Sequence, residues 1–266
     1  MGRFSLGWIA RRALPDFIII GAMKSGTSSL FTFLSQHPQL IAATRKEVHF
    51  FDGGLRPSRD NYAEGPQWYR EHFPLKREMG RGQKTFEASP LYLFNPLAPR
   101  RIADLIPSVK LIAILRNPTD RAISHYFHET GKGRESLPIM SALLAEEERL
   151  RPVLEAGDFK SSAYIHCSYK SRGRYREQLD RYVELFDEGQ ILVLGAEKFY
   201  ADPVSSLRQV CRFIGVDENF TPDDLRPRNV SANRSDVEPE VAEHLDRYFE
   251  PHNRSLYELV GEDFGW

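Results

Sequence analysis

The sequence predicts an α/β domain built as a three-layer sandwich, in which a central, mostly parallel sheet is flanked by helices. Two observations predict this class. Four short β-rich runs alternate along the chain with stretches of helical periodicity, a pattern typical of parallel sheets. Three of the runs are almost continuously apolar, as are strands that are buried on both faces. The 266 residues are enough for one large core and no linker divides them, so we predict a single domain over residues 1–266.

The predicted strands are short, and the first, third and fourth of them are the continuous apolar runs. In order they cover Asp16–Ile20, Lys84–Glu87, Lys110–Leu115 and Gln190–Leu194. Ligands of open α/β sheets bind outside the carboxyl ends of the strands. We therefore expect the functional residues directly after these four runs.

Helical periodicity fills the gaps between the strands. One predicted helix follows the first strand. A second precedes the third strand, and another follows that third strand directly. A longer one leads to the fourth strand, and two more close the chain. In order, the predicted helices cover Ser25–Gln36, Pro96–Ile106, Thr119–Glu129, Ser168–Phe186, Pro203–Phe213 and Val237–Leu259.

Two segments do not follow this alternation. Residues 1–14 form an N-terminal leader that lacks the apolar stretch of about 7–15 residues found in a signal peptide. We expect this leader to dock on the domain, and contact with a membrane surface is the alternative. Residues 52–82 are rich in glycine and proline, with aromatic side chains between them. Loop-rich stretches of this length are often functional, so we predict a flap over an acceptor site, with a plain surface excursion as the alternative.

The composition excludes several classes of protein. Hydrophobic residues make up 41% and charged residues 27%, which is ordinary for a soluble globular protein, and the net charge of −1 gives no case for nucleic acid as a partner. The two cysteines, Cys167 and Cys211, do not make a disulfide framework, so we expect two free thiols, with a single bridge as the alternative. No run approaches the ~18 apolar residues of a membrane span, so we predict no stable membrane insertion and a cytoplasmic location.

The strongest functional pattern is the stretch FIIIGAMKSGTSSL, residues 17–30, where a strand runs into a glycine-containing turn and a hydroxyl-rich helix start. Backbone N–H groups at a helix N-terminus point at whatever lies there, and the helix dipole favours an anion. Lys24 adds a positive charge to this P-loop-like turn. We predict that it binds a phosphate through Lys24, Ser25, Gly26, Thr27, Ser28 and Ser29.

The turn differs from a Walker loop because Thr27, and not lysine, follows Gly26. The third strand ends in Arg116, and a cation at that position suits a second phosphate but suits bound Mg²⁺ poorly. We expect Ser124, about two helical turns further on, to share this phosphate with Arg116. Two anion sites imply a nucleotide with separated phosphates. The histidines lack the spacing of a zinc site, so we predict no metal.

These motifs resemble the sulfotransferases that use 3′-phosphoadenosine-5′-phosphosulfate (PAPS). Lys24–Leu30 resembles their 5′-phosphosulfate loop, and Leu115–Tyr126 resembles their 3′-phosphate segment. Other segments are similar to the heparan sulfate N- and 3-O-sulfotransferase branch and its bacterial relatives. They are Lys46–Asp52 (KEVHFFD), the aromatic residues of the flap, Thr85–Tyr92 and Arg172–Tyr175. The resemblance runs from about Asp16 to Val216.

The resemblance implies transfer of a sulfuryl group from PAPS to a hydroxyl acceptor, with adenosine 3′,5′-bisphosphate (PAP) as the product. It implies that Lys24 contacts the bridging oxygen and the leaving 5′-phosphate. Glu47 matches the general base of that branch, and His49 is a second candidate because another branch uses histidine. Arg116 and Ser124 match the residues that hold the 3′-phosphate, and Tyr175 belongs to a further cofactor-binding segment.

The sequence departs from the family pattern at two places. The 3-O branch carries a lysine where this chain has Ala88, which argues against a heavily sulfated heparan-type acceptor. The late Lys-Gly-Arg nucleotide loop of the family is also absent. The stretch Arg226–Arg234 lies where that loop is expected, and we predict Arg234 as the nucleotide contact, with Arg228 as the alternative.

Two other functions stay open at this point. A P-loop nucleotide kinase would use ATP and Mg²⁺, and the missing lysine after Gly26 counts against it. A non-catalytic nucleotide- or polysaccharide-binding module is the other, and the presence of Lys24, Glu47 and Arg116 counts against that. The acceptor itself is open among a saccharide, a lipid-linked sugar, a polyketide and a small alcohol. No pattern specifies an oligomeric state.

Overall fold

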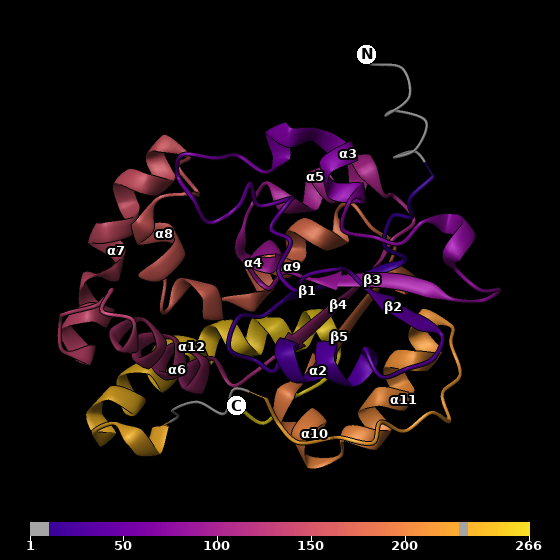
Figure 1. The fold of residues 1–266 in the computed structure, drawn as a ribbon. Helices are drawn as coiled ribbons and strands as arrows, with labels where there is room; N and C mark the ends of the chain where they lie inside the picture. The colour runs from indigo at the N-terminus through magenta and orange to yellow at the C-terminus, as the bar shows by residue number, and fades with distance from the viewer. Residues whose placement is uncertain (1–10, 229–233) are drawn as a thin grey trace.

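Five parallel strands form the central sheet, in the order β2-β3-β1-β4-β5 (Figure 1). The structure is a computed structural model that describes residues 11–228 and 234–266. The strands are β1 Phe17–Gly21, β2 Leu40–Ala42, β3 Lys84–Ala88, β4 Lys110–Leu115 and β5 Ile191–Gly195. The predicted α/β fold with a central parallel sheet is confirmed.

Four of these strands lie within about one residue of their predicted bounds, and β2 was not predicted. It has three residues, of which only Leu40 is buried, so it carries no periodicity that a sequence pattern would detect. It pairs with β3 from the register Leu40–Lys84 to Ala42–Phe86. Tertiary pairing, and not local sequence, therefore defines this edge strand.

Helices cover both faces of the sheet because successive side chains of each strand point to opposite sides. Ile18 and Ile20 of β1 pack into one core, and Phe17 and Ile19 pack into the other. The first core is covered by α5 (Ala98–Leu105), α9 (Tyr175–Val183) and α12 (Pro239–Val260), and the second by α2 (Thr27–Leu34), α10 (Ala196–Ala201) and α11 (Pro203–Ile214). The result is the predicted three-layer sandwich.

A third group of helices lies to the left of the sheet in Figure 1. It comprises α6 (Pro118–Gly131), α7 (Ile139–Ala156) and α8 (Ser162–His166), and α6 and α7 share a small core with α12. The prediction missed α7, which buries only four residues along its 18 and contains Pro152. The predicted helix over residues 168–186 begins only at α9. A Cβ atom at Gly173 would lie 2.6 Å from the Phe249 ring, so close packing shapes the short turn that precedes α9.

Residues 52–82 contain the short helix α3 (Gly65–Arg70), and their aromatic side chains pack inward. Tyr69 is fully buried and stacks on Phe50 at 4.7 Å between ring centroids. Trp68 packs against the same ring, and the Arg101 guanidinium lies 4.0 Å from the centroid of Tyr62. These contacts give the aromatic residues a packing role, and the role of the segment as a flap over an acceptor stays a prediction.

The remaining described segments are short. Helix α4 covers Leu91–Phe94. Most of the predicted leader, residues 1–10, lies outside the described residues, but Arg12 bridges to Leu75 and Ala13 is buried. Among the described helices, none combines the length and the apolarity that crossing a bilayer requires. The cytoplasmic location and the single-domain organisation stay predictions.

Candidate active site

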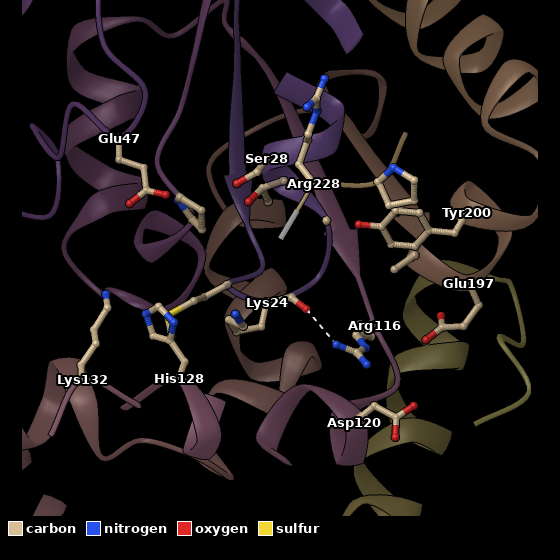
Figure 2. A pocket seen from close by; sticks show the side chains of 16 residues that line it. Lys24, Ser28, Glu47, Arg116, Asp120, His128, Lys132, Glu197, Tyr200 and Arg228 are labelled. Carbon is tan, nitrogen blue, oxygen red and sulfur yellow. Dashed lines mark hydrogen bonds between the residues drawn. The ribbon is translucent and has the colours of Figure 1, made fainter. Parts of the chain in front are cut away.

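A cavity of about 630 Å³ opens beyond the carboxyl ends of the strands. In Figure 2 most of its labelled side chains form two groups, with Lys24 between them and with Ser28 and Arg228 above Lys24. The first, which we name the Glu47 side, consists of Glu47, His128 and Lys132. The second, the Arg116 side, consists of Arg116, Asp120, Glu197 and Tyr200.

The turn between β1 and α2, which the sequence predicts to bind a phosphate, forms the floor of the cavity. Gly26 is the N-cap of α2 and has φ +105°. A Cβ atom there would lie 2.8 Å from the Tyr200 hydroxyl, so the position requires glycine. No side chain caps this helix, and its first turn holds no acidic residue. The N-terminal N–H groups therefore face the cavity, where Gly26, Thr27 and Ser28 line the wall.

Positive charge is concentrated around this turn. Burial and the neighbouring charges of Arg116, Lys132 and Arg121 lower the pKa of Lys24. Since like charges disfavour one another, an anion bound here would relieve the repulsion. The charge distribution fits a ligand with several negative groups, such as a nucleotide bearing separated phosphates.

Arg116, at the end of β4, lines the opposite wall and donates from Nη1 to the Lys24 carbonyl at 3.4 Å. Tyr175 lies beneath both segments, because its hydroxyl donates to the Arg116 carbonyl at 2.9 Å and Ser25 is buried beside it. Ser124 is buried in α6 and does not line the cavity. The structure thus brings Arg116 to the cavity and places Tyr175 behind its wall.

The late arginines occupy different positions. Arg228 lines the cavity, and its backbone N–H donates to the buried Ser29 hydroxyl at 2.9 Å. Arg234 lies outside the cavity wall and forms ion pairs with Asp120 and Asp246, each at 3.3 Å. The residues between them, 229–233, lie outside the described part of the chain. The geometry favours Arg228, the alternative named from the sequence, over Arg234 as the nucleotide contact.

A carboxylate–imidazole–carboxylate arrangement stands behind the Glu47 side. Glu47 lines the cavity, and its Oε2 lies 3.4 Å from Nε2 of His49. Nδ1 of His49 is 2.6 Å from Oδ2 of Asp52. Lys46 holds the other oxygen of Glu47 at 2.6 Å. His49 and Asp52 are both buried, so Glu47 is the member of the three that reaches the cavity.

The charges in this arrangement distinguish the two candidate bases. Burial raises the pKa of Glu47, but hydrogen bonds and charges from His49 and Lys46 outweigh it and bring the pKa to about 2. Burial lowers the pKa of His49, but Asp52 and Glu47 outweigh it and bring the pKa to about 10. At neutral pH, Glu47 is therefore ionised and has a free lone pair, whereas His49 is a cation and cannot accept a proton.

Backbone strain coincides with these candidates. Within the described ranges, the non-glycine residues with positive φ are Lys24 at 70°, Glu47 at 62° and His49 at 54°. Such conformations cost about 1–3 kcal/mol each, persist only where the surroundings enforce them, and cluster at functional sites. All three residues were singled out from the sequence, Lys24 for its charge in the phosphate-binding turn, and Glu47 and His49 through the family resemblance.

We expect conformational stability to fall as the pH rises from about 6.5 towards 10. The pKa of His49 is raised from an ordinary 6.5 to about 10 in the folded protein. The stabilisation from its ion pairs is therefore complete below pH 6.5 and is lost as the pH rises through the folded value. Urea unfolding at pH 6, 8 and 10 measures this loss, and His49→Gln should show a smaller one. An equal loss in both proteins would contradict the assignment.

Sequence reasoning missed several residues of the site. His128 lies in the last turn of α6 and Lys132 is the C-cap of that helix, both beyond the motif that ends at Tyr126, and both line the cavity. Asp52 stands three residues after His49 in KEVHFFD, and that spacing was a signal available in the sequence. Tyr200 carried no such signal, because only the fold brings it against Gly26. Over residues 11–228 and 234–266, no three His, Cys, Asp or Glu side chains gather as metal ligands.

Comparisons with known proteins agree with this geometry. A family model described as "Sulfotransferase domain" matches residues 14–235. Heparan sulfate glucosamine 3-O-sulfotransferase 6 of Mus musculus is 32% identical over 278 residues, which cover 96% of this chain and 75% of that protein. Heparan sulfate glucosamine 3-O-sulfotransferase 3A1 of the same species is 30% identical over 279 residues, which cover 96% of this chain and 65% of that protein. A solved sulfotransferase from Alicyclobacillus acidocaldarius has a TM-score of 0.77 at 34% identity, covering 95% of this chain and 98% of the other.

Proposed function

Because this chain belongs to the sulfotransferase family, we propose that it transfers a sulfuryl group from PAPS to a hydroxyl group of a saccharide. One observation carries the proposal: a single cavity joins a cationic helix N-terminus to an ionised carboxylate on its opposite side. The relatives named above act on heparan sulfate glucosamine, which supports a saccharide as the acceptor.

The Arg116 side and the floor of the cavity would hold the nucleotide. The N–H groups of Gly26, Thr27 and Ser28 would bind the 5′-phosphosulfate together with Lys24. Arg116 would hold the 3′-phosphate, with Arg228 as a second cation. Tyr175 would act indirectly, because its hydroxyl supports the Arg116 backbone from beneath.

Transfer then requires little covalent chemistry from the protein. The acceptor oxygen forms a bond to sulfur while the bond from sulfur to the bridging oxygen breaks, and the electron pair leaves with the 5′-phosphate. Glu47 takes the proton of the acceptor hydroxyl, and Lys24 and the helix N–H groups stabilise the charge that grows on the leaving phosphate. His49 and Asp52 hold the Glu47 carboxylate in place.

The Glu47 side would bind the acceptor. Lys132 and His128 line it, and burial together with the charges of Lys24 and Lys132 lowers the pKa of His128. Ala88 is fully buried in β3 and contributes no charge to this side. We propose a saccharide with an anionic group that Lys132 pairs, and not a densely sulfated one.

Calorimetry with PAP tests the nucleotide site. We expect wild type to bind PAP without Mg²⁺, and Arg116→Ala to weaken binding about 10- to 100-fold, because hydrogen bonds between charged groups contribute roughly 1.5–3 kcal/mol. Arg254→Ala is the matched control, since Arg254 pairs with Glu250 at 3.1 Å and lies outside the cavity wall. Failure of wild type to bind PAP, or binding of ATP only with Mg²⁺, would refute the proposal and favour a kinase.

A further inference from the structure

Glu87 is a fully buried carboxylate in β3 that the proposed chemistry does not use. Three hydroxyl groups donate to it. Those of Tyr69 and Tyr92 reach Oε1 at 2.7 and 3.1 Å, and that of Ser89 reaches Oε2 at 2.7 Å. None of these four residues lines the cavity.

The direction of these hydrogen bonds follows from the number of hydrogens available. Each hydroxyl has one hydrogen, and the one on Ser89 and the one on Tyr92 are given to Glu87. Their oxygens are then free to accept backbone hydrogens from the segment that carries the candidate base. The Ser89 hydroxyl accepts from the N–H of His49 at 3.2 Å. The Tyr92 hydroxyl accepts from Phe50 at 2.9 Å and from Phe51 at 3.4 Å.

The segment held in this way is the strained one. Glu47 and His49 have φ of 62° and 54°, a conformation that relaxes unless neighbouring groups enforce it. The N–H of Glu47 is itself held by the carbonyl of Ala88, the residue after Glu87, at 2.9 Å. Strand β3 and the turn after it thus bind the backbone of residues 47, 49, 50 and 51 in succession.

We propose that Glu87 is the positioning residue of the active site: as the common acceptor for Ser89 and Tyr92, it fixes the backbone of residues 47–51 so that the Glu47 carboxylate faces the cavity. This inference rests on the proposed function, in which Glu47 is the base. The acceptor role rests on geometry, because both oxygens of Glu87 receive hydroxyl donors. Burial raises the pKa of Glu87, and hydrogen bonds from Tyr69, Ser89 and Tyr92 oppose this rise without cancelling it.

The chain offers a matched pair of variants. Tyr92→Phe and Tyr69→Phe each remove one hydroxyl that donates to Oε1 of Glu87, and both rings are fully buried. Of these two hydroxyls, only that of Tyr92 also accepts hydrogen bonds from backbone N–H groups of residues 47–51, the segment that carries the candidate base. A merely structural role for the cluster predicts similar effects for the two variants, whereas a positioning role predicts an effect on turnover for Tyr92→Phe alone.

We expect Tyr92→Phe to lower kcat about 10-fold, because a displaced base loses most of its effect, and Tyr69→Phe to leave kcat within about twofold of wild type. The Kd for PAP should change by less than about twofold in both. Glu87→Gln should lower kcat about 10- to 100-fold. The NH₂ group of glutamine is a donor, so it cannot accept the hydrogen bond of the hydroxyl that it faces. Equal kcat values for Tyr92→Phe and Tyr69→Phe would overturn the proposal, as would a wild-type kcat for Glu87→Gln.

A second measurement does not depend on sulfuryl transfer. Nuclear magnetic resonance titration of the His49 ring reports whether Glu47 and Asp52 still flank it, because these two acids raise its pKa to about 10. The pKa should fall towards 6.5 in Tyr92→Phe and stay high in Tyr69→Phe. Unchanged titration in both variants would overturn the positioning role even if wild type proved to have no transferase activity. An inactive wild type with the expected titrations would instead refute only the proposed function.

Discussion

Replacing Glu47 by glutamine should lower kcat by about 10²- to 10⁴-fold and leave the Kd for PAP within about twofold of wild type. This range is the typical contribution of a general base. The amide keeps the size of the side chain and removes its ability to take a proton. We expect the proposed nucleotide site to be spared, because Arg116 lies on the other side of the cavity and Lys24 lies between the two sides (Figure 2).

Two further variants make this prediction specific. Glu64→Gln is the control, since Glu64 is an exposed carboxylate paired with Arg59 at 3.1 Å and lies outside the cavity wall. His49→Gln should lower kcat by less than Glu47→Gln, because His49 is already protonated and only supports the base. A larger fall for His49→Gln, with near wild-type turnover for Glu47→Gln, would transfer the role of base to His49.

Replacing Lys24 by methionine should lower kcat/KM for PAPS by about 10²- to 10³-fold. A preorganised donor aimed at developing charge typically contributes a factor of this size. Lys24 lies on the floor of the cavity, where burial and neighbouring cations lower its pKa, so its charge is poorly satisfied until an anion binds. Methionine has a similar length and no charge. The measurement is initial-rate kinetics at varied PAPS, with calorimetry of PAP binding alongside.

Lys132→Met is the matched control, because Lys132 lines the same cavity on the Glu47 side. It should raise KM for the acceptor and change the Kd for PAP by no more than about threefold. If both lysine variants weakened PAP binding equally, the two lysines would attract the nucleotide only through their general positive charge. The assignment of Lys24 to the leaving group would then be wrong.

The fold followed from the sequence where its patterns are local. Continuous apolar runs predicted β1, β4 and β5 within about one residue, because strands buried on both faces need such a stretch, and a β-rich run predicted β3 equally closely. The prediction failed where the pattern is weak. Helix α7 buries only one narrow face, and β2 is a three-residue edge strand stabilised by its pairing with β3.

The site followed from the sequence in part. Lys24, Gly26, Thr27 and Ser28 line the cavity together with Glu47 and Arg116, because each follows a strand directly or belongs to a recognisable motif. Ser25 and Ser29, predicted from the same turn, are buried and do not line it. Tyr175 also belongs to a recognisable segment, and Arg234 lies where the missing nucleotide loop is expected, yet the fold places the first behind the wall and pairs the second with acids. A motif identifies a residue type at a position in the chain, but it does not specify which way the side chain faces.

The sequence by itself determined the α/β class, the P-loop-like turn and the family resemblance, because these properties arise from residues that are neighbours in the chain. Only the tertiary structure decided which of Glu47 and His49 reaches the cavity and where Arg228 lies. It also decided which side chains form hydrogen bonds with the backbone of residues 47–51. These depend on contacts such as that between His49 and Ser89, which are 40 residues apart and meet only when the sheet has formed. The pKa shifts of Glu47 and His49 come from charged neighbours that folding brings beside them, against the effect of burial, and that proximity is a property of the folded chain.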